Sequence, residues 1–164
     1  MIIPSVTLRK KRVVEADALE MYESGPLWLV DEDYKNGREL NFKTYDELSG
    51  IYELYLDAEI SQVDDIADSI TGGATMVTLS ESMDREKLRR ALFYTDSLIL
   101  YVRSNREIAD FFLSSGGRRI YSDSMLFEGN SVQFTRTLKC DSCNMVVPIG
   151  GFNDRRNKEA PALP

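Results

Sequence analysis

The chain has 164 residues, of which 43% are hydrophobic and 29% are charged, as in an ordinary globular domain. Its net charge of −7 disfavours extensive binding to nucleic acid, and no apolar run approaches the roughly 20 residues that a membrane-spanning helix needs. The basic N-terminal cluster follows the first apolar residues instead of preceding them, which does not fit a signal peptide. We therefore expect a cytoplasmic domain that contacts neither nucleic acid nor membrane.

Short β-prone runs alternate with helical patterns along the chain. The first strand is predicted at residues 2–8, and the basic cluster at 9–12 that follows it is interpreted as a solvated loop. Further strands are predicted at 26–30, 51–56, 74–79, 97–102, 118–121 and 143–149. Helices are predicted between them, at 16–23, 42–48, 62–70, 83–94, 105–115 and 132–138.

The unit at residues 51–82 has the clearest pattern. A β-prone run is followed by Ser61, a potential helix N-cap, with Asp64 three residues later in the capping-box position. Apolar residues then recur at helical spacing, and Gly72 and Gly73 are placed to end the helix before the next strand. A strand–helix–strand unit of this length predicts a right-handed crossover between two parallel strands.

Seven such strands leave two architectures open, a TIM-type barrel and an open, doubly wound sheet. The first strand is not followed by the Gly-x-Gly-x-x-Gly motif of dinucleotide-binding folds. A complete TIM barrel needs eight units and about 200 residues or more. The chain length therefore favours the open sheet or a shortened barrel.

Five segments, in the same order, resemble motifs of the HisA/HisF family, the phosphoribosyl isomerase and cyclase barrels of histidine biosynthesis, and the likeness is greater to the HisA isomerase. The opening IIPSVTL at 2–8 is similar to the family's I-I-P-A-I-D-L, and WLVDED at 28–33 to W-L-H-V-V-D-L-D. The other three segments are ISQVDDI at 60–66, YSDSMLFEG at 121–129 and VVPIGGF at 146–152.

This resemblance implies a TIM-type (βα) barrel, trimmed to about seven strands because the eighth unit is missing. The barrel would span residues 1–154, followed by a flexible, charged and Pro-rich tail at 155–164. An unclosed edge between the first and seventh strands would be a pairing liability, so something must cover it. We therefore expect a homodimer or another homo-oligomer.

The chain departs from the family at the positions that carry its chemistry. Thr7 stands where the family has a catalytic Asp, and the residues around Asp57 replace a glycine-rich phosphate loop. Gly150 and Gly151 alone keep the pattern of a phosphate-facing loop. These departures predict a HisA-like protein that has lost phosphoribosyl isomerase activity and has a non-catalytic role or a different ligand.

Two alternatives remain. An isomerase acting on a phosphoribosyl-like substrate would need a new acid–base pair, for which the strand ends offer Asp31, Asp123 and Glu128. Alternatively, a divalent-metal-dependent enzyme would use Asp31, Asp57 and Glu59. The ordinary interpretation of such acids is that they cap helices. The predicted contacts to a phosphorylated small molecule are Thr7, Asp57, Arg103, Ser122, Gly150 and Gly151, with no cofactor and no bound metal.

Cys140 and Cys143 form a Cys-x-x-Cys pair before the last predicted strand. With no histidine and no second pair, one chain cannot build a closed zinc site from them. Two thiols in a structural turn, a redox pair and a zinc bridge between two chains all remain open.

Overall fold

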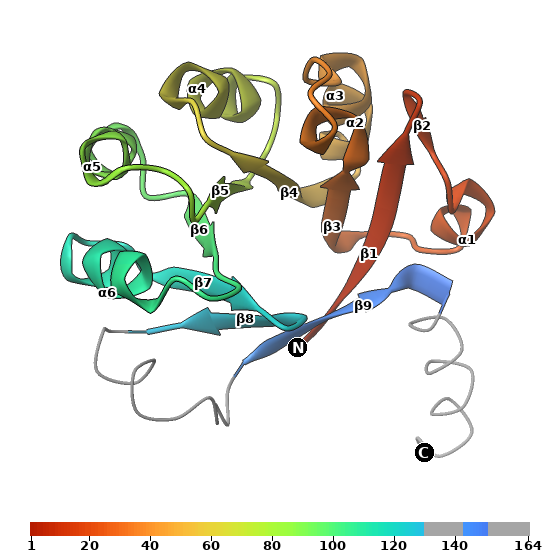
Figure 1. The fold of residues 1–164 in the computed structure, drawn as a ribbon. Helices are drawn as coiled ribbons and strands as arrows, with labels where there is room; N and C mark the ends of the chain where they lie inside the picture. The colour runs from red at the N-terminus through yellow and green to blue at the C-terminus, as the bar shows by residue number, and fades with distance from the viewer. Residues whose placement is uncertain (130–142, 151–164) are drawn as a thin grey trace.

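The computed structural model describes residues 1–129 and 143–150. Eight strands form a closed barrel in which β1 pairs with β9 (Figure 1). In barrel order these are β1 (Ile2–Arg9), β3 (Gly25–Asp31), β4 (Tyr52–Ile60), β5 (Met76–Ser80), β6 (Leu98–Tyr101), β7 (Arg119–Ser122), β8 (Met125–Glu128) and β9 (Asn144–Pro148). A two-residue strand, β2 (Arg12–Val13), pairs antiparallel with the end of β1.

The helices lie outside the ring of strands (Figure 1). They are α1 (Ala16–Glu20), α2 (Glu32–Lys35), α3 (Phe42–Ser49), α4 (Val63–Thr71), α5 (Arg85–Tyr94) and α6 (Arg106–Ser114). Within the described part of the chain, none of them is long and apolar enough to span a membrane.

The prediction of a TIM-type (βα) barrel trimmed to about seven strands is wrong, because the barrel is a closed, mixed sheet of eight strands. The chain turns back after β7 at Asp123 and Ser124, whose φ angles of 49° and 64° form a two-residue hairpin turn. The strand that follows, β8, runs antiparallel to both β7 and β9. β8 brings the barrel to eight strands, one more than the sequence predicts. The pairing of β1 with β9 closes the barrel, so the predicted open edge does not exist. The helix predicted at 132–138 lies outside the described residues.

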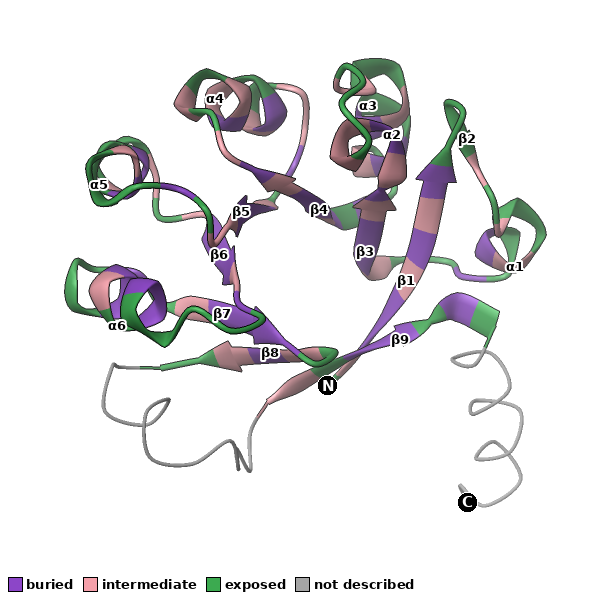
Figure 2. Cartoon of the chain, viewed as in Figure 1, coloured by how far each residue is buried: buried purple, intermediate pink, exposed green. Residues whose placement is uncertain are grey.

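Alternation along the strands separates two apolar cores. Side chains of one parity fill the inside of the barrel, where Trp28 and Tyr121 lie with their ring centroids 4.4 Å apart. Side chains of the other parity, such as Leu29 and Leu56, pack outward against the helices. Figure 2 shows this burial on the strands and on the inner faces of the helices. The same alternation decides which polar side chains can reach the barrel interior.

The predicted strand–helix–strand unit at 51–82 is confirmed, since β4 and β5 are parallel and α4 lies between them in the chain. Its helix cap differs from the prediction, because the N-cap is Gln62, one residue after Ser61. β4 is also longer than predicted, and its pairing with β5 shifts register between Leu56 and Ile60. Glu59 lies in this irregular stretch with a φ angle of 50°.

The basic cluster at 9–12 is the turn between β1 and β2. Lys10 and Lys11 both have left-handed φ angles, of 51° and 62°, which are unfavourable for residues other than glycine. The buried carboxylate of Asp33 accepts both of their backbone N–H groups, at 2.7 and 2.9 Å. These hydrogen bonds offset the strain and hold the turn against α2.

Candidate functional site

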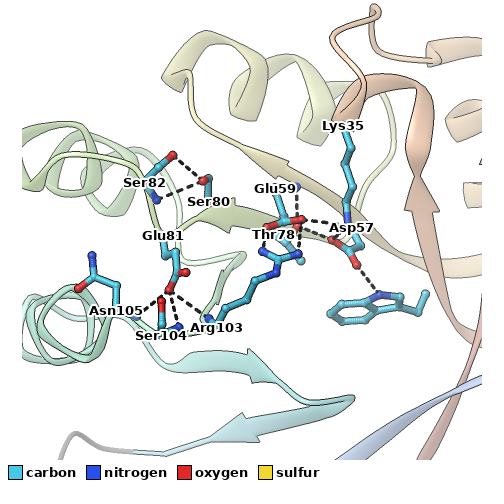
Figure 3. A network of polar contacts seen from close by, with 11 residues as sticks. Lys35, Asp57, Glu59, Thr78, Ser80, Glu81, Ser82, Arg103, Ser104 and Asn105 are labelled. Carbon is cyan, nitrogen blue, oxygen red and sulfur yellow. Dashed lines mark hydrogen bonds and ion pairs between the residues drawn. The ribbon is translucent and has the colours of Figure 1, made fainter.

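Two cations and two carboxylates meet where β3, β4, β5 and β6 end, an arrangement that we call the mouth cluster: Lys35, Asp57, Glu59 and Arg103 (Figure 3). Lys35 Nζ lies 2.9 Å from Asp57 Oδ1 and 3.2 Å from Glu59 Oε2. Arg103 contacts Glu59 through both terminal nitrogens, with Nη2 2.9 Å from Oε2. The cluster is charge-balanced, with two positive and two negative groups.

Asp57 is the most buried member, with 3% of its surface exposed. Inside the barrel its carboxylate also accepts hydrogen bonds from Trp28 Nε1 at 3.0 Å and from the Thr78 hydroxyl at 3.1 Å. Burial raises the pKa of Asp57 above its ordinary value, although the contact with Lys35 opposes this shift. Asp57 is therefore a desolvated carboxylate whose charge depends on its partners.

The close contacts between cations and carboxylates shift the pKa values of both kinds of group. Burial alone would lower the pKa of Lys35, but Asp57 and Glu59 together raise it, so Lys35 stays charged. The hydrogen bonds from Arg103 and the charge of Lys35 outweigh burial and lower the pKa of Glu59. The Arg103 guanidinium also lies over the ring of Tyr101, 4.0 Å from its centroid, in a cation–π contact.

A fifth charged residue, an acid, borders the mouth cluster. Glu81 lies after β5, and its Oε2 accepts backbone N–H groups from Arg103, Ser104 and Asn105 at 3.0, 3.3 and 3.0 Å. Consecutive N–H groups before a helix, here α6, commonly bind anions. In this chain its own carboxylate takes that place, so these donors are already used (Figure 3). Asn105 caps α6, because its side-chain oxygen accepts the backbone N–H of Ile108.

Asp31, predicted as a catalytic residue, lies on the outer face of β3. Strand alternation places it on the helix side, whereas Trp28 and Val30 belong to the interior core. Its fully buried carboxylate accepts hydrogen bonds from the Tyr45 hydroxyl, the Asn41 amide and the backbone N–H of Tyr34. Asp31 therefore caps α2 and joins the strand to α3, without access to the mouth cluster.

Replacing Asp31 with alanine is expected to lower the free energy of unfolding by about 1–3 kcal/mol, because the buried Tyr45 hydroxyl would lose its acceptor. Chemical denaturation of D31A, Y45F and the double variant would measure this coupling. We expect the double variant to lose clearly less stability than the sum of the two single losses. Additive losses would contradict the assigned contact.

The other two residues predicted as catalytic lie at opposite ends of the barrel. Asp123 is the first residue of the β7–β8 turn, with an exposed side chain. Glu128 ends β8, and because β8 is antiparallel it lies beside Arg119 at the start of β7, at the opposite end of the barrel. Glu128 Oε1 lies 3.0 Å from Arg119 Nε. The structure thus does not bring Asp31, Asp123 and Glu128 together.

Of the predicted ligand contacts, the structure brings Asp57 and Arg103 into one network, in which Lys35 and Glu59 link them. Thr7 is engaged elsewhere, since its hydroxyl and its backbone N–H donate to the Glu15 carboxylate at 2.9 and 2.7 Å. Ser122 is buried at the end of β7. Gly150 follows β9, and a Cβ atom there would meet nothing within 4 Å. Gly151 and Cys140 lie outside the described residues, so neither the glycine pair nor the Cys-x-x-Cys pair is placed.

The metal hypothesis required Asp31, Asp57 and Glu59 to converge. Asp31 faces the helices, while Asp57 and Glu59 already bind Lys35. Across residues 1–129 and 143–150, no group of three or more Asp, Glu, His or Cys side chains could hold a metal ion. The mouth cluster is therefore an ion-pair network and not a set of free acidic ligands.

Sequence reasoning missed Lys35, the residue that neutralises this site. It lies between the strand predicted at 26–30 and the helix predicted at 42–48, where the sequence predicts no element, whereas the structure shows a one-turn helix, α2, directly after β3. This turn places Lys35 beside β4. A helix of four residues leaves no periodic pattern in the sequence, so no signal there indicated the position of Lys35.

Comparison with protein families and with curated proteins does not identify a relative of this chain. The HisA/HisF resemblance thus remains a prediction from short motifs. No protein-family model matches the chain, and no curated protein matches it significantly.

Proposed function

We propose that the chain is a small-molecule-binding barrel that does not catalyse a HisA-type isomerisation, and that its ligand is a phosphorylated compound held at the mouth cluster. The observation that carries this proposal is the mutual pairing of Lys35, Asp57, Glu59 and Arg103. A relationship to the HisA/HisF proteins is part of the proposal, supported by the ordered sequence motifs.

The pairing argues against isomerase chemistry. An aldose–ketose shift needs a general base and a general acid within reach of adjacent substrate carbons. Asp57 and Glu59 are the carboxylates of the mouth cluster, and both are held by Lys35. Proton transfer to either carboxylate would neutralise it and so weaken its ion pair with Lys35. Glu81, next to them, is occupied by three backbone donors.

The same cluster retains capacity to bind an anion. A guanidinium has five N–H donors and an ammonium three. Glu59 takes two donors of Arg103, while Asp57 and Glu59 take two of Lys35, so both cations keep donors that no ion pair between described residues uses. The Arg103 side chain is 54% exposed, which makes it the accessible cation of the cluster. Lys35 and Arg103 neutralise Asp57 and Glu59, so the negative charge that a bound phosphate would meet beside the cluster is that of Glu81, which accepts three backbone N–H groups.

Ligand-dependent stabilisation tests this proposal. We expect ribose 5-phosphate at about 100 times its Kd to stabilise the protein by about 2.7 kcal/mol, a rise of roughly 5–10 °C in Tm, whereas ribose should give no shift. Arg103→Ala should abolish the shift. Arg106→Ala, which removes an exposed arginine at the start of α6, should retain it. Binding elsewhere is indicated if R103A and the wild type shift equally, and the absence of any shift with phosphosugars would overturn the proposal.

A second candidate function has one observation in its favour. Asp57, a carboxyl whose pKa is raised by burial, directly contacts the ammonium of Lys35, and such pairs occur at acid–base active sites. An isomerase-type enzyme would then use Asp57 in place of Asp31, Asp123 or Glu128. Formation of ketose phosphate in the presence of the wild type, lost in Asp57→Asn, would favour this candidate over binding alone.

A further inference from the structure

A cavity of about 730 Å³, which we call the α3 cavity, lies beside the first turn of α3. It is lined by Lys11 of the β1–β2 turn, by Asp33 of α2 and by residues 38–44, which lead into α3 (Figure 1). None of the four mouth-cluster residues lines it, so it is a separate cavity. Small-molecule sites typically enclose about 300–1,000 Å³, a range that includes this volume.

Three cations line the α3 cavity, namely Lys11, Arg38 and Lys43. All three residues are exposed, and none takes part in an ion pair between described residues. The chain as a whole carries a net charge of −7, so these cations concentrate positive charge at one place on an acidic protein. The α3 cavity therefore favours an anionic ligand.

Two acids, Asp33 and Glu39, also line the α3 cavity. Asp33 is buried and accepts two backbone N–H groups of the β1–β2 turn and the amide of Asn41. Burial would raise the pKa of Asp33, but these hydrogen bonds and the charge of Arg38 lower it, so the carboxylate stays ionised with its donors in place. Glu39 is exposed and forms no ion pair between described residues, so it can accept hydrogen bonds from a ligand.

The β1–β2 turn presents Lys11 to this cavity from a strained backbone. Lys10 and Lys11 have left-handed φ angles of 51° and 62°, in a type of turn where Asn and Gly are usual. Glycine would adopt either angle without the steric strain that lysine meets. Backbone strain of this kind is common where a side chain serves binding. Lys11 lines the cavity and Lys10 does not, so the two lysines can be compared directly.

Phe42 adds an aromatic surface to the α3 cavity. The residue is 46% exposed, and its ring meets the ring of Tyr45 edge-on, with the centroids 6.2 Å apart. The ring is thus held in place while nearly half of the residue stays accessible. An aromatic ring on which a base can stack, next to Lys and Arg side chains that bind phosphate, is the combination that a nucleotide requires.

We propose that the α3 cavity binds a nucleotide. Its phosphates are held by Lys11, Arg38 and Lys43, and its base packs on Phe42. Glu39 accepts hydrogen bonds from the ribose hydroxyl groups. A free phosphate would use the cations alone, so the aromatic surface favours a nucleotide over a smaller anion. This site is additional to the phosphosugar site proposed at the mouth cluster and does not depend on it.

Isothermal titration calorimetry with ADP tests this proposal. We expect ADP to bind at least about tenfold more tightly than pyrophosphate, which lacks the base, and than adenosine, which lacks the phosphates. Phe42→Leu should raise the Kd for ADP by roughly tenfold and leave the Kd for pyrophosphate unchanged. Lys43→Met should raise the Kd for both ligands by roughly tenfold.

The β1–β2 turn offers a matched pair of variants. Lys11→Gly and Lys10→Gly each remove one lysine and one strained residue, and each keeps the backbone N–H group that donates to Asp33. Both variants should have a Tm at least equal to that of the wild type. K11G should raise the Kd for ADP by roughly tenfold. K10G should stay within about threefold of the wild type at about 0.15 M salt, because Lys10 does not line the cavity.

Three results would overturn the inference: no ADP binding at about 1 mM, equal weakening by K10G and K11G, or pyrophosphate binding as tight as that of ADP. Loss of ADP binding in Arg103→Ala but not in K43M would also overturn it, because the nucleotide would then lie at the mouth cluster. Stabilisation by ribose 5-phosphate should persist in K43M, so failure of one site can be distinguished from failure of the other.

Discussion

Replacing Lys35 with methionine is expected to lower the free energy of unfolding by about 3 kcal/mol or more at pH 8. The substitution keeps most of the side-chain volume but leaves Asp57, which is 3% exposed, without its countercharge. Removing one partner of a buried ion pair typically costs about 3–5 kcal/mol, because the other charge stays desolvated. Urea denaturation followed by circular dichroism would measure the loss.

The loss should depend on pH in a defined direction. Burial already raises the pKa of Asp57 above 3.8, and without Lys35 it should rise further. A group whose pKa is higher in the folded state contributes stability at low pH and loses that contribution as pH rises through the folded value. K35M should therefore be closer to the wild type at pH 5 than at pH 8. Lys43→Met, on the exposed surface of α3, should change stability by less than about 0.5 kcal/mol, and an equal loss for K35M at both pH values would contradict the account.

Replacing Trp28 with alanine should have a comparable or larger effect. Trp28 is fully buried inside the barrel, packs against the tilted ring of Tyr121 and donates a hydrogen bond to Asp57. Removal of a large core aromatic typically costs about 3–5 kcal/mol. Since Trp28 is the only tryptophan, unfolding has to be followed by circular dichroism and not by its fluorescence.

Trp28→Phe separates packing from hydrogen bonding. Phenylalanine keeps part of the ring volume but removes the Nε1 donor to Asp57, so we expect a loss of about 1–3 kcal/mol, smaller than for W28A. If the two variants were equally unstable, the hydrogen bond and not the packing of the interior would dominate at this position. That result would contradict the described role of the ring.

Much of the strand and helix order could be predicted from the sequence. The apolar runs that became β3, β4 and β5 are short and bounded by turn residues, and α4 shows a clear helical period. These patterns depend on residues that are close in the sequence, so they can be recognised without knowing the tertiary contacts. The strand–helix–strand unit at 51–82 was therefore correct in type, with errors of a few residues at its ends.

The direction of β8 could not be predicted in the same way. Its turn uses Asp123 and Ser124 at left-handed φ angles, without the Asn-Gly or Asp-Gly pair that usually marks a two-residue hairpin. β8 itself has four residues, too few for a periodic pattern. The sequence therefore suggested a missing eighth unit where the chain closes its barrel with an antiparallel strand.

The candidate site was predictable only in part. The carboxylates Asp57 and Glu59 could be located because they follow an apolar run, and Arg103 for the same reason. Their pairing depends on the irregular register of β4 and on the short helix that carries Lys35. Both are tertiary features. Asp57 and Glu59, which the sequence offers as metal ligands, are consequently ion-paired with Lys35 and Arg103.

The most direct test of a binding role without catalysis is the ³¹P NMR spectrum of ribose 5-phosphate mixed with an equimolar amount of the wild-type protein and followed for a day. If the protein binds the sugar phosphate without converting it, the phosphate resonance should shift or broaden when the protein is added, and no ketose phosphate resonance should appear. An unchanged resonance would contradict binding, and a growing ketose phosphate resonance would contradict the absence of catalysis.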